Sequence, residues 1–174
     1  GIPNGQKLVE MMDDAIYNLP AREDGVEYNL ESVIVNVNKG KTTEIMGQDC
    51  MAIAGKPTIL EQVGDMQFEI SPLAFYQVNP TQMKVLYDLV LKYADLKGDE
   101  NILDLYCGVG TISLMLAKKA KYVYGIEVVK EAIINAKNNA KKNNINNVEF
   151  KVAKVEDVID EYVKKDVNTI VVDP

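Results

Sequence analysis

The chain has 174 residues, 47% of them hydrophobic, so it is long enough to form a full core in one or two domains. It has no histidine, which excludes histidine-based acid–base catalysis and histidine metal ligands, and its two cysteines indicate neither a disulfide framework nor a metal site. It has no apolar run of membrane-spanning length and no secretory signal, so we expect a soluble, cytoplasmic protein with no membrane partner and no metal.

Charge is unevenly distributed along the chain. Residues 1–70 carry 12 acidic and 5 basic side chains (12 − 5 = 7 in excess, net −7), whereas residues 71–174 carry 14 of each. Arg22 is the single arginine in the sequence. An acidic segment repels phosphate, so any strong electrostatic attraction to nucleic acid must lie largely outside these residues.

The first 70 residues predict a small α+β subdomain with an antiparallel sheet. Apolar residues at helical spacing predict an amphipathic helix over 6–18, which Pro20 ends. From Ser32 the apolar period changes to two, which is typical of strands. Gly64-Asp65 predicts a two-residue hairpin turn. The strands are expected at 33–37, 42–46, 51–54, 59–63 and 66–68.

Residues 71–174 predict an α/β domain with a Rossmann-like parallel sheet. Asn79 is a good N-cap and Pro80 a good first residue for a helix. Strands and helices then alternate, as in parallel sheets. The strands are expected at 101–105, 122–127, 148–152 and 168–172, and the helices at 111–119, 130–142 and 155–164.

The segment that joins the first of these strands to its helix indicates a nucleotide site. Gly108 and Gly110 would let the backbone approach a ligand where a Cβ atom would collide. The third glycine of the dinucleotide fingerprint is replaced by Ser113, so a pyrophosphate ligand fits poorly. Glu127 ends the next strand, where an acid can accept the ribose hydroxyls of a nucleoside. Together they favour an adenosine ligand without phosphates.

These residues resemble known methyltransferases. Asp104-x-x-x-Gly108-x-Gly110 with Glu127 is similar to the S-adenosylmethionine site of Rossmann-like methyltransferases. Phe75-Tyr-Gln-Val-Asn79, the string 103–111 and Val171-Val-Asp-Pro174 narrow the resemblance to the RNA uracil-C5 methyltransferase family, over roughly residues 31–174. The resemblance implies that S-adenosylmethionine is the cofactor and that its binding residues are Gln77, Tyr106, Gly108, Gly110, Thr111, Glu127 and Asp173.

The family's chemistry needs two groups that we do not expect in this chain. Uracil C5 is too weak a nucleophile to take a methyl group unaided, so a cysteine thiolate first adds to C6, and a base later removes the C5 proton. The resemblance puts that cysteine and the base, a glutamate, beyond Pro174, so we interpret the sequence as part of a longer protein. Cys107 is expected to be a small packing residue and Cys50 a core residue of a strand.

Three functions remain open. The first is methylation of uridine C5 in RNA, with 23S ribosomal RNA favoured over transfer RNA as the substrate. The second is methylation of an amino group, because Asp173-Pro174 also begins an Asp-Pro-Pro-aromatic motif that holds exocyclic amines. The third is a nucleoside-binding module without chemistry of its own.

Overall fold

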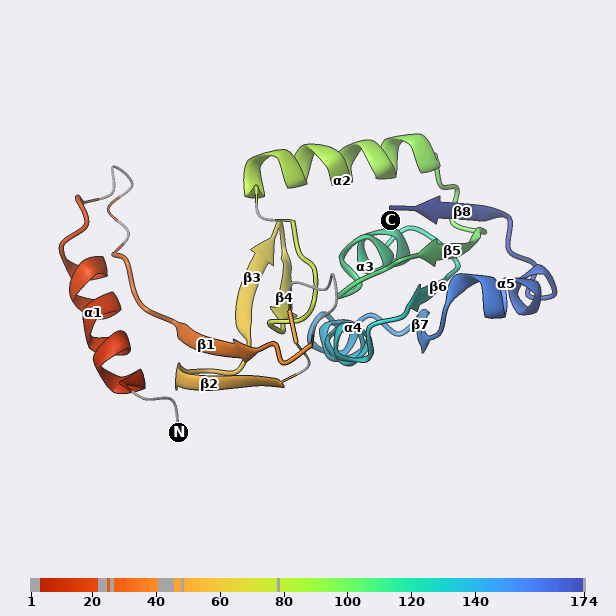
Figure 1. Cartoon of the computed structure of the whole chain (residues 1–174). Coiled ribbons are helices and arrows are strands. Elements are labelled where there is room, and N and C mark those ends of the chain that lie inside the picture. The colour runs from red at the N-terminus through yellow and green to blue at the C-terminus, as the bar shows by residue number, and fades with distance from the viewer. Residues whose placement is uncertain are drawn as a thin grey trace. The chain divides into compact units, whose positions relative to one another are not determined.

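A computed structural model describes residues 4–21, 25, 27–40, 46–47, 49–77 and 79–173 (Figure 1). The chain divides into two compact units, residues 1–59 and 60–174. The sequence suggested a boundary after residue 70 instead. The difference lies in the hairpin around Gly64, whose apolar side chains join the core of the second unit. No helix in the described ranges has the length and apolar character needed to cross a membrane.

The first unit contains one helix and one strand pair. Helix α1 (Gly5–Tyr17) lies where the apolar spacing predicts it, and none of its described residues is buried. Strand β1 (Ser32–Val37) pairs antiparallel with β2 (Asp49–Gly55), with a register irregularity after Val33. The strand expected at 42–46 lies outside the described residues, apart from Met46, which lies in a bend.

The small antiparallel sheet predicted for residues 1–70 is divided in two in the described structure. Strand β3 (Ile59–Val63) pairs with β4 (Met66–Ile70) in a second two-stranded sheet. The predicted two-residue turn, Gly64-Asp65, connects them. Period-two patterns predict that strands form, but they do not say which strands pair.

The second unit is built on a parallel sheet of four strands in the order β7-β6-β5-β8 (Figure 1). Each predicted α/β element of this region is present within a few residues of its expected bounds. The helices are α2 (Pro80–Ala94), α3 (Thr111–Ala117), α4 (Lys130–Lys142) and α5 (Val155–Val163), and the strands are β5 (Asn101–Leu105), β6 (Tyr122–Glu127), β7 (Val148–Val152) and β8 (Thr169–Val172).

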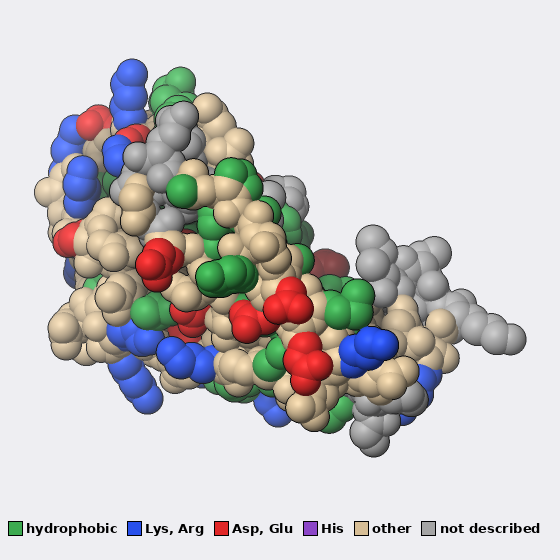
Figure 2. All heavy atoms as spheres, turned by 90° about the vertical axis from the view of Figure 1, so that its left-hand side faces the viewer, with side chains coloured by type: hydrophobic (Ala, Val, Ile, Leu, Met, Phe, Trp, Pro, Cys, Tyr) green, Lys and Arg blue, Asp and Glu red, His purple; other side chains and the backbone are tan. Residues whose placement is uncertain are grey.

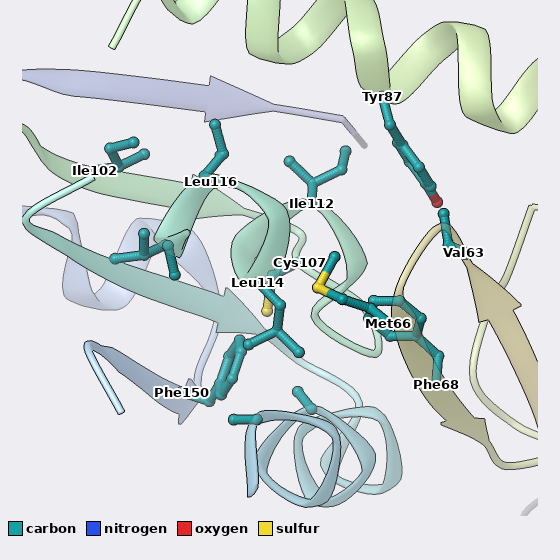
Figure 3. Close-up of a cluster of buried hydrophobic side chains, with 14 of the residues drawn as sticks. Val63, Met66, Phe68, Tyr87, Ile102, Cys107, Ile112, Leu114, Leu116 and Phe150 are labelled. Carbon is teal, nitrogen blue, oxygen red and sulfur yellow. The ribbon is translucent and has the colours of Figure 1, made fainter. Parts of the chain in front are cut away.

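Side chains of β5 alternate between two cores. Ile102 joins a large cluster in which α3, α4 and the β3–β4 hairpin pack together (Figure 3). Leu103 and Leu105 join a smaller cluster with Val158 and Tyr162 of α5. All five residues of β5 are buried, as expected for a central parallel strand. The alternation places Asp104 on the same face as Ile102, beside α3.

Gly110 is required by packing within this fold. Its φ of 83° lies in the left-handed region, and a Cβ atom there would lie 2.8 Å from Cζ of Phe150 and 3.1 Å from Cβ of Ala136. The collision is with the core, so the sequence-based reason for this glycine, close approach of a ligand, is replaced by a packing reason.

We expect Gly110→Ala to destabilise the chain by about 2–4 kcal/mol, because left-handed strain and overpacking add. Gly64→Ala is the matched control, since Gly64 has a φ of 61° but no atom within 4 Å of its added Cβ. The control should lose only the strain, about 1–2 kcal/mol. Urea unfolding of both variants measures the difference, and equal losses would contradict the packing role of Gly110.

Candidate cofactor-binding site

A pocket of about 360 Å³ lies at the carboxyl ends of β5, β6 and β8 in the second unit. Ligands of open parallel sheets bind at this edge. Six of the seven predicted cofactor residues line it, namely Gln77, Tyr106, Gly108, Thr111, Glu127 and Asp173. Gly110, the seventh, is not among the lining residues. The sequence gave no cofactor role to Phe75, Tyr76, Tyr87, Cys107, Val109 and Ile112, which line it too. Asp104, the first residue of the predicted cofactor motif, is also in the lining.

The turn after β5 holds its shape through positive φ angles and backbone hydrogen bonds. Tyr106 has a φ of 64°, unusual for a residue with a side chain, and Gly108 has a φ of 54°. The Cys107 N–H donates to the Ile126 carbonyl at 3.0 Å, which ties the turn to β6. The Tyr106 side chain is 44% exposed, so it is a wall of the pocket and not a core aromatic. Backbone strain of this kind is typical of ligand sites.

Glu127 connects two chain segments at the edge of the pocket, the turn after β5 and the start of α4. One of its carboxylate oxygens, Oε2, accepts a hydrogen bond from Gly108 N–H at 3.2 Å. The other, Oε1, accepts from Val128 N–H at 2.7 Å and Val129 N–H at 2.9 Å, just before α4. A carboxylate offers about four acceptor positions, so about one remains for a ligand hydroxyl. Glu127 therefore fixes the turn and still has acceptor capacity.

Asp104 is a buried acid at the base of the pocket. Its side chain is 1% exposed and accepts a hydrogen bond from the Ser113 hydroxyl. Burial raises the pKa of Asp104 to about 7, and the nearby charge of Asp173 adds to this rise. Ser113 stands where the dinucleotide fingerprint has glycine, and the structure gives the serine a role as hydrogen-bond donor to this acid.

Two tyrosines form part of the pocket wall. Burial raises the pKa of Tyr87, and this effect outweighs a side-chain hydrogen bond with Thr111, which lowers the pKa. The Tyr76 hydroxyl is buried and has no hydrogen-bond partner within the described part of the chain. Burial also raises the pKa of Tyr76 well above its usual value. Both tyrosines therefore remain protonated, and the Tyr76 hydroxyl is available as a donor to a bound ligand.

The charge of the pocket selects among ligands. The described lining includes three acids, Asp104, Glu127 and Asp173, and neither lysine nor arginine. Such a lining repels a pyrophosphate and favours a ligand that carries positive charge. S-adenosylmethionine carries a sulfonium and an ammonium group, so the residues present fit this cofactor. Across the described ranges, no group of three or more His, Cys, Asp or Glu residues is placed to hold a metal ion.

Neither cysteine has the environment of a nucleophile. Cys107 is buried, and burial raises the pKa of its thiol well above the usual value, with the charges of Asp104 and Glu127 adding to the rise. The predicted packing role of Cys107 agrees with this environment. Cys50 is only partly buried in β2, where its sulfur receives a contact from the Asn36 side chain at 3.1 Å, so the expected core position is only partly confirmed.

Comparisons with known proteins agree with this geometry. Residues 96–173 match a family model for a "Methyltransferase domain". The fold is that of a class I methyltransferase. The chain is 50% identical over 145 residues to an uncharacterized RNA methyltransferase of Clostridium tetani, with 82% of this chain and 32% of the relative covered. It is 45% identical over 179 residues to another, from Caldanaerobacter subterraneus, with 97% and 40% covered.

A solved structure is also similar. It is the Pyrococcus abyssi tRNA (uracil-54, C5)-methyltransferase in complex with S-adenosyl-L-homocysteine, with a TM-score of 0.67 and 32% identity. The match covers 84% of this chain and 35% of that protein. This chain spans about a third of the length of the curated relatives that it matches first.

We expect Glu127→Ala to weaken binding of S-adenosylhomocysteine by roughly ten- to a hundred-fold, because a hydrogen bond to a charged group contributes about 1.5–3 kcal/mol. Glu131→Ala is the control, since Glu131 lies in the first turn of α4 and not in the pocket. Titration calorimetry measures both dissociation constants, and a thermal melt checks that each variant is folded. Equal affinity of Glu127→Ala and the unmodified chain would remove Glu127 from the site.

The raised pKa of Asp104 makes stability depend on pH. The pKa rises from the usual 3.8 to about 7 on folding, so between those values the folded chain binds more protons than the unfolded chain. Its free energy of unfolding should therefore fall as pH rises through this window, by up to about 1.4 kcal/mol per pH unit from this group. Asp104→Asn should flatten that fall, whereas the exposed Asp88→Asn should not. Urea unfolding at several pH values measures the free energy of unfolding of both variants. If Asp104→Asn shows the same dependence on pH as the unmodified chain, the raised pKa of Asp104 is refuted.

Proposed function

We propose that this chain is the cofactor-binding part of an RNA methyltransferase that uses S-adenosylmethionine to methylate C5 of uridine. The observation that carries the proposal is the acidic pocket at the strand ends, in which Gln77, Glu127 and Asp173 come together from three separate segments. The relatives named RNA methyltransferases support the RNA substrate. The uracil-C5 assignment rests on the sequence motifs and on the tRNA methyltransferase with the similar fold.

S-adenosylmethionine supplies an electrophilic methyl group when bound. Glu127 would accept a ribose hydroxyl with its remaining acceptor capacity, without losing its bond to the Gly108 N–H. Gln77 and Asp173, which also line the pocket, would contact other polar groups of the cofactor. The exposed ring of Tyr106 would cover its aromatic or apolar parts. These residues would orient the methyl group toward the nucleobase.

The nucleophile and the base of the reaction are proposed to come from elsewhere in the longer protein. A thiolate that adds to C6 must be ionised near neutral pH and accessible to the base. Cys107 has a raised pKa and is 8% exposed, so it meets neither condition. The cysteine and glutamate that the family resemblance puts beyond Pro174 would perform these two steps.

Recognition of the RNA also requires other parts of the protein. Figure 2 shows acidic side chains among the basic and apolar ones on one face of the molecule. The sequence carries a net charge of −7. We expect the affinity for RNA to come from segments outside these residues, because phosphate contacts need lysine and arginine. The sequence favoured ribosomal RNA over transfer RNA as the substrate, and methyl transfer to each RNA distinguishes the two.

The test is methyl transfer by the full-length protein. Unmodified ribosomal and transfer RNA are incubated with labelled S-adenosylmethionine, and the nucleosides are separated by mass spectrometry. We expect 5-methyluridine, and none from residues 1–174 alone, because loss of the nucleophile removes the activated intermediate. RNA that contains 5-fluorouridine should trap a covalent complex, because the base that removes the C5 proton cannot remove a fluorine in its place.

Each alternative function gives a different result in this assay. Methylation of an exocyclic amine, without a covalent complex, would support the amino-group methyltransferase. Binding of S-adenosylhomocysteine without any methyl transfer by the full-length protein would support a nucleoside-binding module. Methyl transfer by residues 1–174 that is lost in Cys107→Ser would overturn the packing role of Cys107.

A further inference from the structure

Two asparagines of α4 and the asparagine at its C-cap form a ladder that binds the backbone of β4 and of the residue that follows it. They are Asn135, Asn139 and Asn143, spaced four residues apart, and we call them the asparagine ladder. Each side-chain oxygen accepts one backbone N–H, from Ser71 at 3.0 Å, Glu69 at 2.7 Å and Gln67 at 3.0 Å respectively. The amide groups of the last two also donate to the carbonyls of Glu69 at 3.1 Å and Gln67 at 2.7 Å.

The spacing of helix and strand explains why the ladder fits. Four helical residues rise about 6.0 Å, and two strand residues rise about 6.4–6.8 Å, so every fourth helix residue meets every second strand residue. In the described chain β4 has only β3 as a strand neighbour. An asparagine side chain offers one acceptor and two donors, so it can replace a neighbouring peptide group at the open edge. The ladder therefore takes the place of a third strand.

One member of the ladder also contacts the cofactor turn. Asn139 is fully buried, and besides its two bonds to Glu69 it donates to the Val109 carbonyl at 3.1 Å. Val109 lies between Gly108 and Gly110 and lines the pocket. Asn139 thus joins two segments that are 40 residues apart in sequence (109 − 69 = 40). Asn143 has the same type of bonds to the strand but none to the turn.

Asn135, the first residue of the ladder, binds the start of the loop that carries Gln77 into the pocket. Asn135 is 3% exposed, and its side-chain oxygen accepts hydrogen bonds from both the N–H and the hydroxyl of Ser71. Ser71 is the first residue after β4, and the loop that follows it carries Phe75, Tyr76 and Gln77 into the pocket. The same helix therefore holds both the glycine turn, through Asn139, and the start of the loop that carries Gln77, through Asn135.

We propose that Asn139 is a positioning residue that couples the cofactor turn to β4, so that an ordered pocket and a docked hairpin depend on each other. The proposal rests on the proposed function only for the identity of the ligand. It predicts that ligand binding slows hydrogen exchange in β4, although no residue of β4 lines the pocket. It also predicts that loosening Asn139 weakens binding without touching a pocket side chain.

The first experiment needs no ligand. Hydrogen–deuterium exchange of residues 1–174 is compared for the unmodified chain, Asn139→Ala and Asn143→Ala. Both variants should exchange faster in β4, because both lose bonds to the strand. Only Asn139→Ala should also exchange faster in the turn, residues 106–110, where the Gly110 N–H bonds to the Cys107 carbonyl at 2.9 Å. Equal behaviour of the turn in both variants would overturn the coupling.

The second experiment adds S-adenosylhomocysteine to the same proteins. The dissociation constant should rise about tenfold in Asn139→Ala, which corresponds to about 1.4 kcal/mol, and stay within about twofold in Asn143→Ala. In the unmodified chain, ligand at 100 times its dissociation constant should slow exchange at Gln67 and Glu69 by up to about 100-fold. This last measurement needs no variant, so an absence of slower exchange in β4 would overturn the proposal even where Asn139→Ala fails to fold.

The outcomes separate the two proposals. Binding by the unmodified chain without slower exchange in β4, or an equal loss of affinity in both variants, would make the ladder purely structural and leave the proposed function intact. Absence of S-adenosylhomocysteine binding would refute the proposed cofactor. The ligand-free exchange of the turn would then still support or overturn the coupling through Asn139.

Discussion

The turn between β5 and α3 is the constraint on which the second unit depends. Its backbone takes positive φ angles at Gly108 and Gly110, which glycine adopts readily, and at Tyr106, where the surroundings must maintain the angle. Phe150 and Ala136 fill the space beside Gly110, and Glu127 holds the Gly108 N–H. The core, the acidic residue and the turn therefore specify one another. A pocket wall made of backbone results, and it can be approached closely by a ligand.

The pocket that forms around this turn is defined by its charge. Asp104 is buried beneath it, Glu127 lies at its edge, and Asp173 follows β8. Because a buried carboxylate is costly, the pKa of Asp104 rises, and a positive charge bound close to it would lower that pKa again. The absence of lysine and arginine from the described lining explains why a cationic nucleoside suits this site better than a nucleotide with phosphates.

The hairpin of β3 and β4 belongs to the second unit because of two different interactions. Val63, Met66 and Phe68 bury their side chains in the core that Figure 3 shows. The asparagine ladder then satisfies the backbone of β4 at its open edge. Burial of apolar area supplies the driving force, and the directional hydrogen bonds set the register. The hairpin is thereby held next to the loop that carries Gln77.

Local sequence determined the parallel α/β order, the element bounds and the N-cap at Asn79, whose side chain accepts from the Gln82 N–H as predicted. These features depend on periodicity, capping and turn chemistry, which act over a few residues. The strand-end rule also identified most of the pocket. Tertiary structure alone decided the packing reason for Gly110, the partner of Ser113, the pKa of Asp104 and the docking of β4 on α4. Each depends on residues far apart in sequence, and a one-dimensional pattern carries no information on which distant groups meet.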